Sequence, residues 1–223
     1  MGQHFLFPPR ILFKRIESNF RIFYDDLGTY CRRMDWRFDV PQCSSDEVRF
    51  YHQWQNNLVE VELFEQYSDN RAKAFLFTYH IPSPVGNPKN KGRANLTDNP
   101  PEVGYKHQIY VAIPMNYPSV RAVESSGQRS DITYIESRSQ LWHPRFYLQQ
   151  KSWGCIMVNG ELDRIAMNLF QQLLWEPGHV WKLPGEHETT NNRAASQWGK
   201  EMGHNEIHQF MIRLMTERWG EAT

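Results

Sequence analysis

The sequence predicts an α+β protein in which a long N-terminal helix precedes an antiparallel sheet and further helices follow the sheet. Residues 11–31 carry apolar side chains at steps of three and four, which is the period of a helix. Residues 58–64 alternate apolar and charged side chains, which is the period of a half-buried strand. Helical periodicity returns near the C-terminus. Because the strands follow one another between the helices, we expect a four-stranded antiparallel meander.

The first helix is predicted from an apolar stripe formed by Leu12, Ile16, Phe20, Phe23, Leu27 and Tyr30. Pro8 and Pro9 precede it, at a position where a helix tolerates proline. Cys31 continues the stripe, so we expect its thiol to be buried. We expect this helix to pack at one end of the sheet.

Four strands are predicted, in residues 58–64, 74–79, 109–113 and 131–135. Residues 39–46 contain Pro41 and two serines and are interpreted as a loop. Residues 47–57 fit either a short helix or a strand. Residues 82–106 are rich in proline, glycine, asparagine and lysine, and are predicted to be an exposed surface loop inserted into a single domain of residues 1–223.

Three helices are predicted in the C-terminal part, in residues 162–174, 192–202 and 205–219. The first has Leu162, Ile165, Leu169 and Leu173 on one face, and we expect it to lie across one face of the sheet. Asn159 stands just before it and is a candidate N-cap.

Composition excludes several classes of function. The chain has 25 basic and 25 acidic residues, so its net charge of zero gives no attraction to nucleic acid or to an anionic membrane. No apolar run approaches the roughly 20 residues that span a bilayer. The odd count of three cysteines indicates a reducing compartment, and we expect the cytoplasm. The nine histidines have no metal-binding spacing, and no glycine-rich phosphate loop is present, so we expect neither a metal nor a cofactor.

Cys155 is the main candidate for chemistry. A thiolate is a good nucleophile that can take an acyl group from another thioester and pass it to an amine. Gly154 directly before it allows the close approach of a protein substrate. The alternative is a buried cysteine packed between Trp153 and Ile156. Trp142, Trp153 and Trp175 flank this region and are interpreted as buried core.

Tyr117-Pro118, His143-Pro144 and Cys155, followed by a helix, occur in the order found in ubiquitin-conjugating enzymes, and the chain resembles that family over residues 10–220. The resemblance implies a UBC-like fold. It also implies that Cys155 accepts a ubiquitin-like protein from an activating enzyme and that the modifier is transferred to an amine of a protein target. The sequence is more similar to the bacterial relatives in antiviral defence operons than to the eukaryotic members.

The same resemblance assigns roles to three further residues. His143 matches the histidine of the family's His-Pro-Asn motif, which braces its loop through backbone hydrogen bonds. Arg145 replaces the asparagine that stabilises the oxyanion, so it is either an oxyanion donor or an exposed salt-bridging residue, and we favour the exposed one. Asn159 offers a carboxamide near Cys155, although helix capping explains it equally well. No acidic residue stands directly beside Cys155, so the candidate acids are Asp163, Glu161 and residues 186–192.

Two other functions stay open. If Gly154 is used to set the register, Met157 occupies the nucleophile position and the protein is an inactive binding module for a ubiquitin-like protein or an activating enzyme. An unrelated cysteine hydrolase that uses Cys155 with a distant histidine is the third possibility. Replacement of Cys155 by serine, assayed with an activating enzyme and a ubiquitin-like protein, separates the three.

Overall fold

A computed structural model describes residues 8–64, 73–85, 100–114, 117, 133–146, 152–153, 161–179 and 192–220. The helices in this part of the chain are α1 (Pro9–Arg33), α2 (Leu162–Leu173), α3 (Arg193–Met202) and α4 (His204–Trp219). All four were predicted from the sequence. None of the helices in these ranges has both the length and the apolar character needed to cross a membrane.

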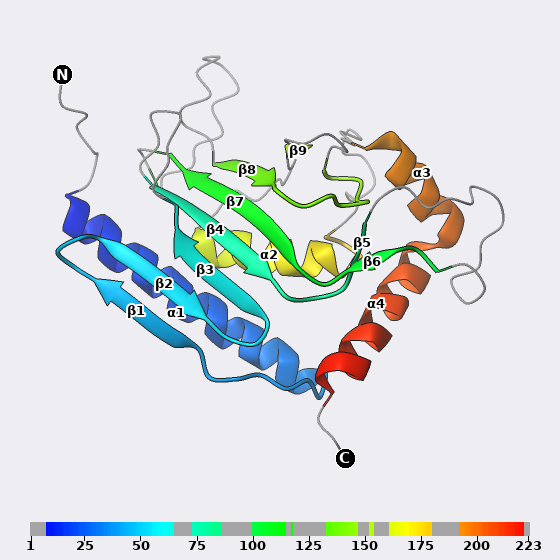
Figure 1. The fold of residues 1–223 in the computed structure, drawn as a ribbon, viewed down its shortest axis with the longest axis horizontal. Helices are drawn as coiled ribbons and strands as arrows, with labels where there is room; N and C mark the ends of the chain where they lie inside the picture. Colours follow the sequence, from blue (N-terminus) through cyan, green and yellow to red (C-terminus); the bar gives the residue numbers. More distant parts are fainter. Residues whose placement is uncertain are drawn as a thin grey trace.

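One antiparallel sheet forms the centre of the protein (Figure 1). Its strands, in spatial order, are β1 (Gln42–Asp46), β2 (Tyr51–Gln55), β3 (Val59–Leu63), β4 (Lys73–Tyr79), β7 (His107–Ile113), β8 (Tyr134–Ser137) and β9 (Ser152–Trp153). The predicted α+β class is therefore confirmed. The predicted number of four strands is wrong, because the described residues contribute seven strands to this sheet.

At one edge, strand β1 escaped prediction and β2 lies in residues 47–57, for which strand was one of two alternatives, because neither sequence alternates apolar and polar residues clearly. Strand β1 has the sequence QCSSD and is almost entirely exposed, but it pairs with β2. The interpretation of residues 39–46 as a loop is therefore wrong for residues 42–46 and holds for residues 39–41. In β2 the buried positions are His52 and Trp54, and a polar residue at one of them hides the period of two. Pairing with neighbouring strands, not side-chain pattern, places both segments in the sheet.

We expected helix α1 to pack at one end of the sheet. It lies across one face of the sheet instead. The predicted stripe is buried throughout. The Phe20 ring packs edge-on against Phe75 and Phe77 of β4, with centroid separations of 5.2 and 6.1 Å, and against Trp54 of β2 at 6.5 Å. This helix therefore covers β2 to β4.

Helix α2 lies beside α1 on the same face, behind the sheet in the view of Figure 1. Its predicted apolar face is buried. The Tyr79 hydroxyl of β4 donates a hydrogen bond of 2.9 Å to the Ala166 carbonyl, and the Tyr30 ring of α1 packs on Phe170 at 5.6 Å. The two helices and the sheet thus share one hydrophobic core.

The described ends of the 82–106 segment are not an exposed loop. Strands β5 (Ser83–Pro84) and β6 (Val103–Gly104) pair as a two-stranded ribbon, and Ser83 and Pro84 are buried. The His107 ring at the start of β7 donates from Nε2 to the carbonyls of Ile81 and Gly104, at 3.1 and 3.0 Å. The His107 ring thereby bonds to one backbone carbonyl at each end of the segment. Residues 86–99 lie outside the described ranges.

The C-terminal helix returns to the end of α1. The Trp36 indole donates to the Thr216 hydroxyl at 3.0 Å, and the Arg37 amide donates to the Trp219 carbonyl at 2.6 Å. In Figure 1 the C-terminal end of α4 and the end of α1 meet at one corner of the molecule. Contacts between residues about 180 positions apart therefore hold the C-terminal end of α4 against the segment that follows α1.

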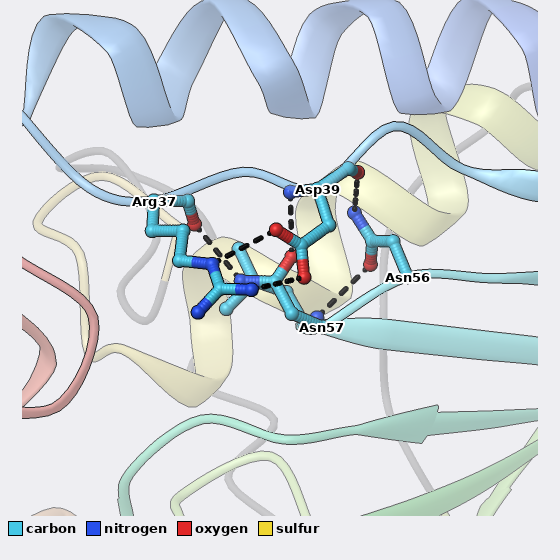
Figure 2. Close-up of polar contacts among 5 residues, drawn as sticks. Arg37, Asp39, Asn56 and Asn57 are labelled. Carbon is cyan, nitrogen blue, oxygen red and sulfur yellow. Dashed lines mark hydrogen bonds and ion pairs between the residues drawn. The ribbon is translucent and has the colours of Figure 1, made fainter. Parts of the chain in front are cut away.

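The segment after α1 is also tied to the turn between β2 and β3 (Figure 2). The Asn57 side chain accepts from the Asp39 amide and donates to the Arg37 carbonyl, both at 2.9 Å. The Asn56 side chain accepts from the amides of Leu58 and Val59, at 3.0 and 2.8 Å. These bonds replace the backbone partners that the turn itself lacks.

Candidate functional site

The His-Pro loop after β8 is part of the protein interior. All residues from 141 to 146 are buried. The Trp142 amide donates to the Pro84 carbonyl of β5 at 2.9 Å, and the Asn192 amide, just before α3, donates to the Pro144 carbonyl at 3.1 Å. The loop is therefore held between segments that lie about 60 positions upstream and 50 downstream of it in the chain.

His143 braces this loop from within. Its Nδ1 accepts the Arg145 amide at 3.1 Å, so Nε2 carries the proton and donates to the Gln172 carbonyl of α2 at 3.0 Å. Its ring packs edge-on against Trp175, with centroids 5.2 Å apart. Burial, assisted by the nearby Arg145 charge, lowers the pKa of His143 to about 3. The ring is neutral with both nitrogens engaged, so its role is structural.

Arg145 is not an exposed residue, in contrast to the interpretation we favoured. It is 8% exposed, and its amide takes part in the brace of His143. Arg145 shares the burial of the whole loop, since residues 141–146 are all buried. Trp142 and Trp175 are buried as predicted, with exposures of 2% and 0%.

Cys155, Met157 and Asn159 lie outside the described residues. For Trp153 the structure describes the backbone and not the exposure of the side chain. The chain leaves the described structure at β9, on the edge of the sheet where Glu136 pairs with Trp153, and it resumes at Glu161. Residues 154–160 thus connect the sheet edge to the start of α2. The described residues nearest to Cys155 along the chain are Trp153 and Glu161.

The start of α2 is capped by a hydroxyl from far away in the sequence. The expected N-cap, Asn159, is not at the N-cap position, which Glu161 occupies without a side-chain capping bond. Instead the Tyr117 hydroxyl accepts the Leu162 amide at 2.8 Å and donates to Asn19 Oδ1 of α1 at 2.6 Å. Tyr117 is 1% exposed, and burial raises its pKa well above the usual range. The Tyr-Pro motif therefore positions the helix that follows Cys155.

Two carboxylates meet at the same place. Asn19 Nδ2 donates to Glu161 Oε2 at 2.6 Å and to Asp163 Oδ1 at 3.0 Å, while Arg15 of α1 forms an ion pair with Glu161. We call Asn19, Tyr117, Glu161 and Asp163 the carboxylate network. It stands one residue beyond the segment that contains Cys155.

The two carboxyl groups differ in their electrostatics. Burial opposes ionisation of Glu161, but the hydrogen bonds from Asn19 and Arg15 outweigh burial and lower its pKa. Burial raises the pKa of Asp163, and the neighbouring Glu161 charge raises it further. The surroundings therefore shift the two groups in opposite directions, Glu161 toward its ionised form and Asp163 toward its protonated form.

Sequence reasoning identified Glu161 and Asp163 as nearby acids but missed Asn19 and Tyr117 as their partners. Asn19 looks like an ordinary polar position between apolar residues of a helix, and only the packing of α1 against α2 reveals that it is 2% exposed. Among the described residues, no group of three or more His, Cys, Asp or Glu side chains is arranged to hold a metal ion.

These features define an α+β protein with a braced His-Pro loop and a carboxylate network at the start of α2. A fold of this class supports many functions, so the class alone assigns none. No protein-family model matches the chain, and no curated protein or solved structure matches it either.

Proposed function

We propose that the protein is a ubiquitin-conjugating-enzyme-like transferase of the cytoplasm. It accepts a ubiquitin-like protein from an activating enzyme as a thioester on Cys155 and transfers it to an amine of a protein target. A role in a bacterial antiviral defence operon follows from the same resemblance.

The observation that carries this proposal is the brace of His143. The proposal needs a histidine that holds the His-Pro loop through backbone hydrogen bonds, and His143 makes two of them, one to the loop and one to α2. The order of elements adds support: a helix, an antiparallel meander, a Tyr-Pro segment, the His-Pro loop, Cys155, a helix and a helical pair.

The chemistry has two steps. The Cys155 thiolate attacks the carbonyl carbon of the thioester between the modifier and the activating enzyme, the carbon–sulfur bond to the activating enzyme breaks, and the thiolate of that enzyme leaves. The target amine then attacks the same carbonyl, its proton passes to a carboxylate, and the Cys155 thiolate leaves as the amide forms. Asp163 is the proton acceptor that we propose, and Arg145 is the proposed donor to the oxyanion.

The first prediction concerns the thioester. With ATP and the activating enzyme and ubiquitin-like protein of neighbouring genes, the protein forms an adduct that a thiol reductant cleaves. Cys155→Ser forms an oxyester that resists the reductant, because serine provides an oxygen nucleophile. Cys43→Ser is the matched control, since Cys43 is exposed on the distant edge strand β1 and its loss leaves the adduct unchanged. Gel electrophoresis with and without reductant measures all three.

An adduct that persists in Cys155→Ser as a reducible thioester would contradict the assignment of this cysteine. Absence of any adduct, together with binding of the ubiquitin-like protein or the activating enzyme, would make the protein an inactive binding module. Release of a small acyl group instead would indicate the cysteine hydrolase.

The second prediction concerns Asp163. Asp163→Asn slows transfer from the preformed thioester to free lysine about tenfold or more, because the amine loses its proton acceptor. Formation of the thioester stays unchanged. Glu161→Gln is the control, and we expect a smaller effect because its lowered pKa makes Glu161 a poor base. Single-turnover assays that give equal rates for both variants would assign Asp163 to structure alone.

A further inference from the structure

A cavity of about 150 Å³ lies between the first turns of α1, strand β2 and the beginning of β4. It is lined by Pro9, Leu12, Phe13, Ile16, Phe50, His52 and Lys73. Arg15 and Asn19 leave α1 toward α2, whereas the cavity residues leave it toward the sheet. The cavity is thus separate from the carboxylate network and owes nothing to the function proposed for Cys155.

His52 gives the cavity a polar group without a partner. The side chain is 1% exposed, and neither ring nitrogen makes a hydrogen bond of good geometry within the described part of the chain, although the Phe13 backbone lies close enough to raise the pKa of the ring. The ring stacks on Phe13, with centroids 4.1 Å apart, and meets the edge of Phe20 at 5.8 Å. A buried polar group normally has a partner, so an orphaned imidazole beside a cavity points to an occupant that supplies one.

The backbone at the mouth of the cavity is strained. Phe50 has a φ of 52°, a left-handed conformation that a bulky side chain rarely adopts. Its ring packs edge-on against Phe13 at 6.0 Å. Ion pairs of Glu47 with Lys14 and Arg10 hold the β1–β2 turn against α1. Strain of this kind gathers at binding sites, where surrounding contacts keep a side chain in place.

The lining determines what the cavity accepts. Five of its seven side chains are apolar, which favours an apolar body, and cavities of about 150 Å³ lined by such residues bind molecules of the size of benzene. Burial lowers the pKa of His52 to about 4, so at neutral pH the ring has one donor and one acceptor nitrogen. At the His52 ring the charge of Glu17 acts against the charges of Lys73 and Lys14, and Glu17 itself is paired with Lys14 and Arg21. A neutral polar group suits this balance better than an anion.

We propose that the cavity between α1 and β2 binds a small neutral aromatic molecule with one hydroxyl group, whose hydroxyl bonds to His52. The aromatic body displaces water from the apolar walls, and the hydroxyl satisfies the imidazole. Phenol is the simplest member of this class.

Phenol, toluene and benzoate are the probes that test the proposal on the whole protein. By calorimetry, phenol binds about fivefold more tightly than toluene, a ratio that corresponds to about 1 kcal/mol for one hydrogen bond. In spectra of ring ¹⁵N, phenol moves the His52 signals. The signals of His107 do not move; this histidine is equally buried, but its Nε2 already bonds to backbone carbonyls.

Two variants separate the parts of the site. His52→Leu keeps the apolar walls, so its phenol-to-toluene ratio falls to about one. Ile16→Phe fills the cavity and abolishes binding of both probes while the fold is retained. Failure of wild-type protein to bind phenol, equal affinities for phenol and toluene, or tighter binding of benzoate would overturn the proposal, and the first and second of these need no variant.

Discussion

Three buried histidines differ in what their ring nitrogens contact, although the sequence presents them alike. His143 uses both nitrogens on backbone groups, and His107 uses one. His52 uses neither in the described residues. An unpaired buried donor or acceptor costs free energy. We therefore interpret His143 as a structural brace and propose His52 as a binding group. This distinction decides which histidine belongs to which site.

At the residue scale we predict that His143→Leu lowers the free energy of unfolding by about 3 kcal/mol, because the Arg145 amide and the Gln172 carbonyl are left buried without partners. His80→Leu is the control, since the half-buried His80 ring bonds to an exposed carboxylate, Glu60. We expect a much smaller loss there. Urea denaturation measures both; equal losses would remove the special role of the brace.

At the scale of elements, long-range polar contacts hold the helices and turns in place. Tyr117 caps α2 from a segment that lies 45 residues upstream of Leu162. Asn57 and Asn56 tie the β2–β3 turn to the chain that follows α1 (Figure 2). Each contact satisfies a backbone group that the element cannot satisfy by itself.

The turn in Figure 2 offers a matched comparison. Asn57→Ala removes two bonds to backbone groups of Arg37 and Asp39, so it lowers the free energy of unfolding by about 1–2 kcal/mol. Arg37→Ala removes an ion pair with Asp39 whose side chains are 64% and 43% exposed, and little change is expected because solvent screens it. Chemical denaturation of the two variants tests this order, and a larger effect of Arg37→Ala would reverse the interpretation.

At the scale of the whole molecule, one aromatic core joins all four described helices to the sheet, and it encloses ionisable groups. Burial is the main cause that lowers the pKa of His52 and His107 to about 4 and of His143 to about 3. Each is therefore neutral in the folded protein at neutral pH. Protonation favours the unfolded chain, where a histidine has its ordinary pKa.

The pH dependence of stability follows from these shifts. The contribution of each histidine is complete above its unfolded pKa of about 6.5 and is lost as the pH falls toward the folded pKa. At pH 4.5 the loss is about 2.5 kcal/mol for each of the three, and most of it develops above the pH at which ordinary carboxyl groups protonate. We expect the urea midpoint to fall steeply between pH 6.5 and 4.5. A flat profile over this window would show that the rings are accessible to solvent.

Much of the fold could be predicted because local pattern is enough for some elements. The period of α1 was visible at Leu12 and Phe20, and that of β3 at Val59 and Val61. The exposed edge strand β1 was not visible and β2 stayed open between a helix and a strand, because partner strands and not side chains place them. For the candidate site, His143 and the two acids near α2 were found, whereas the partner Asn19 was not.

The sequence by itself determined the α+β class, the four helices, the apolar faces that pack together and the position of Cys155 after a His-Pro loop. These follow from periodicity and from turn-forming residues, which act within a few positions of the chain. Only the tertiary structure decided that α1 crosses the sheet, that Tyr117 caps α2 and that Arg145 is buried. It also decided that His52 lies beside a cavity and makes no hydrogen bond of good geometry among the residues that the structure describes. Burial and hydrogen-bond partners depend on residues brought together from distant positions, and no local pattern contains that information.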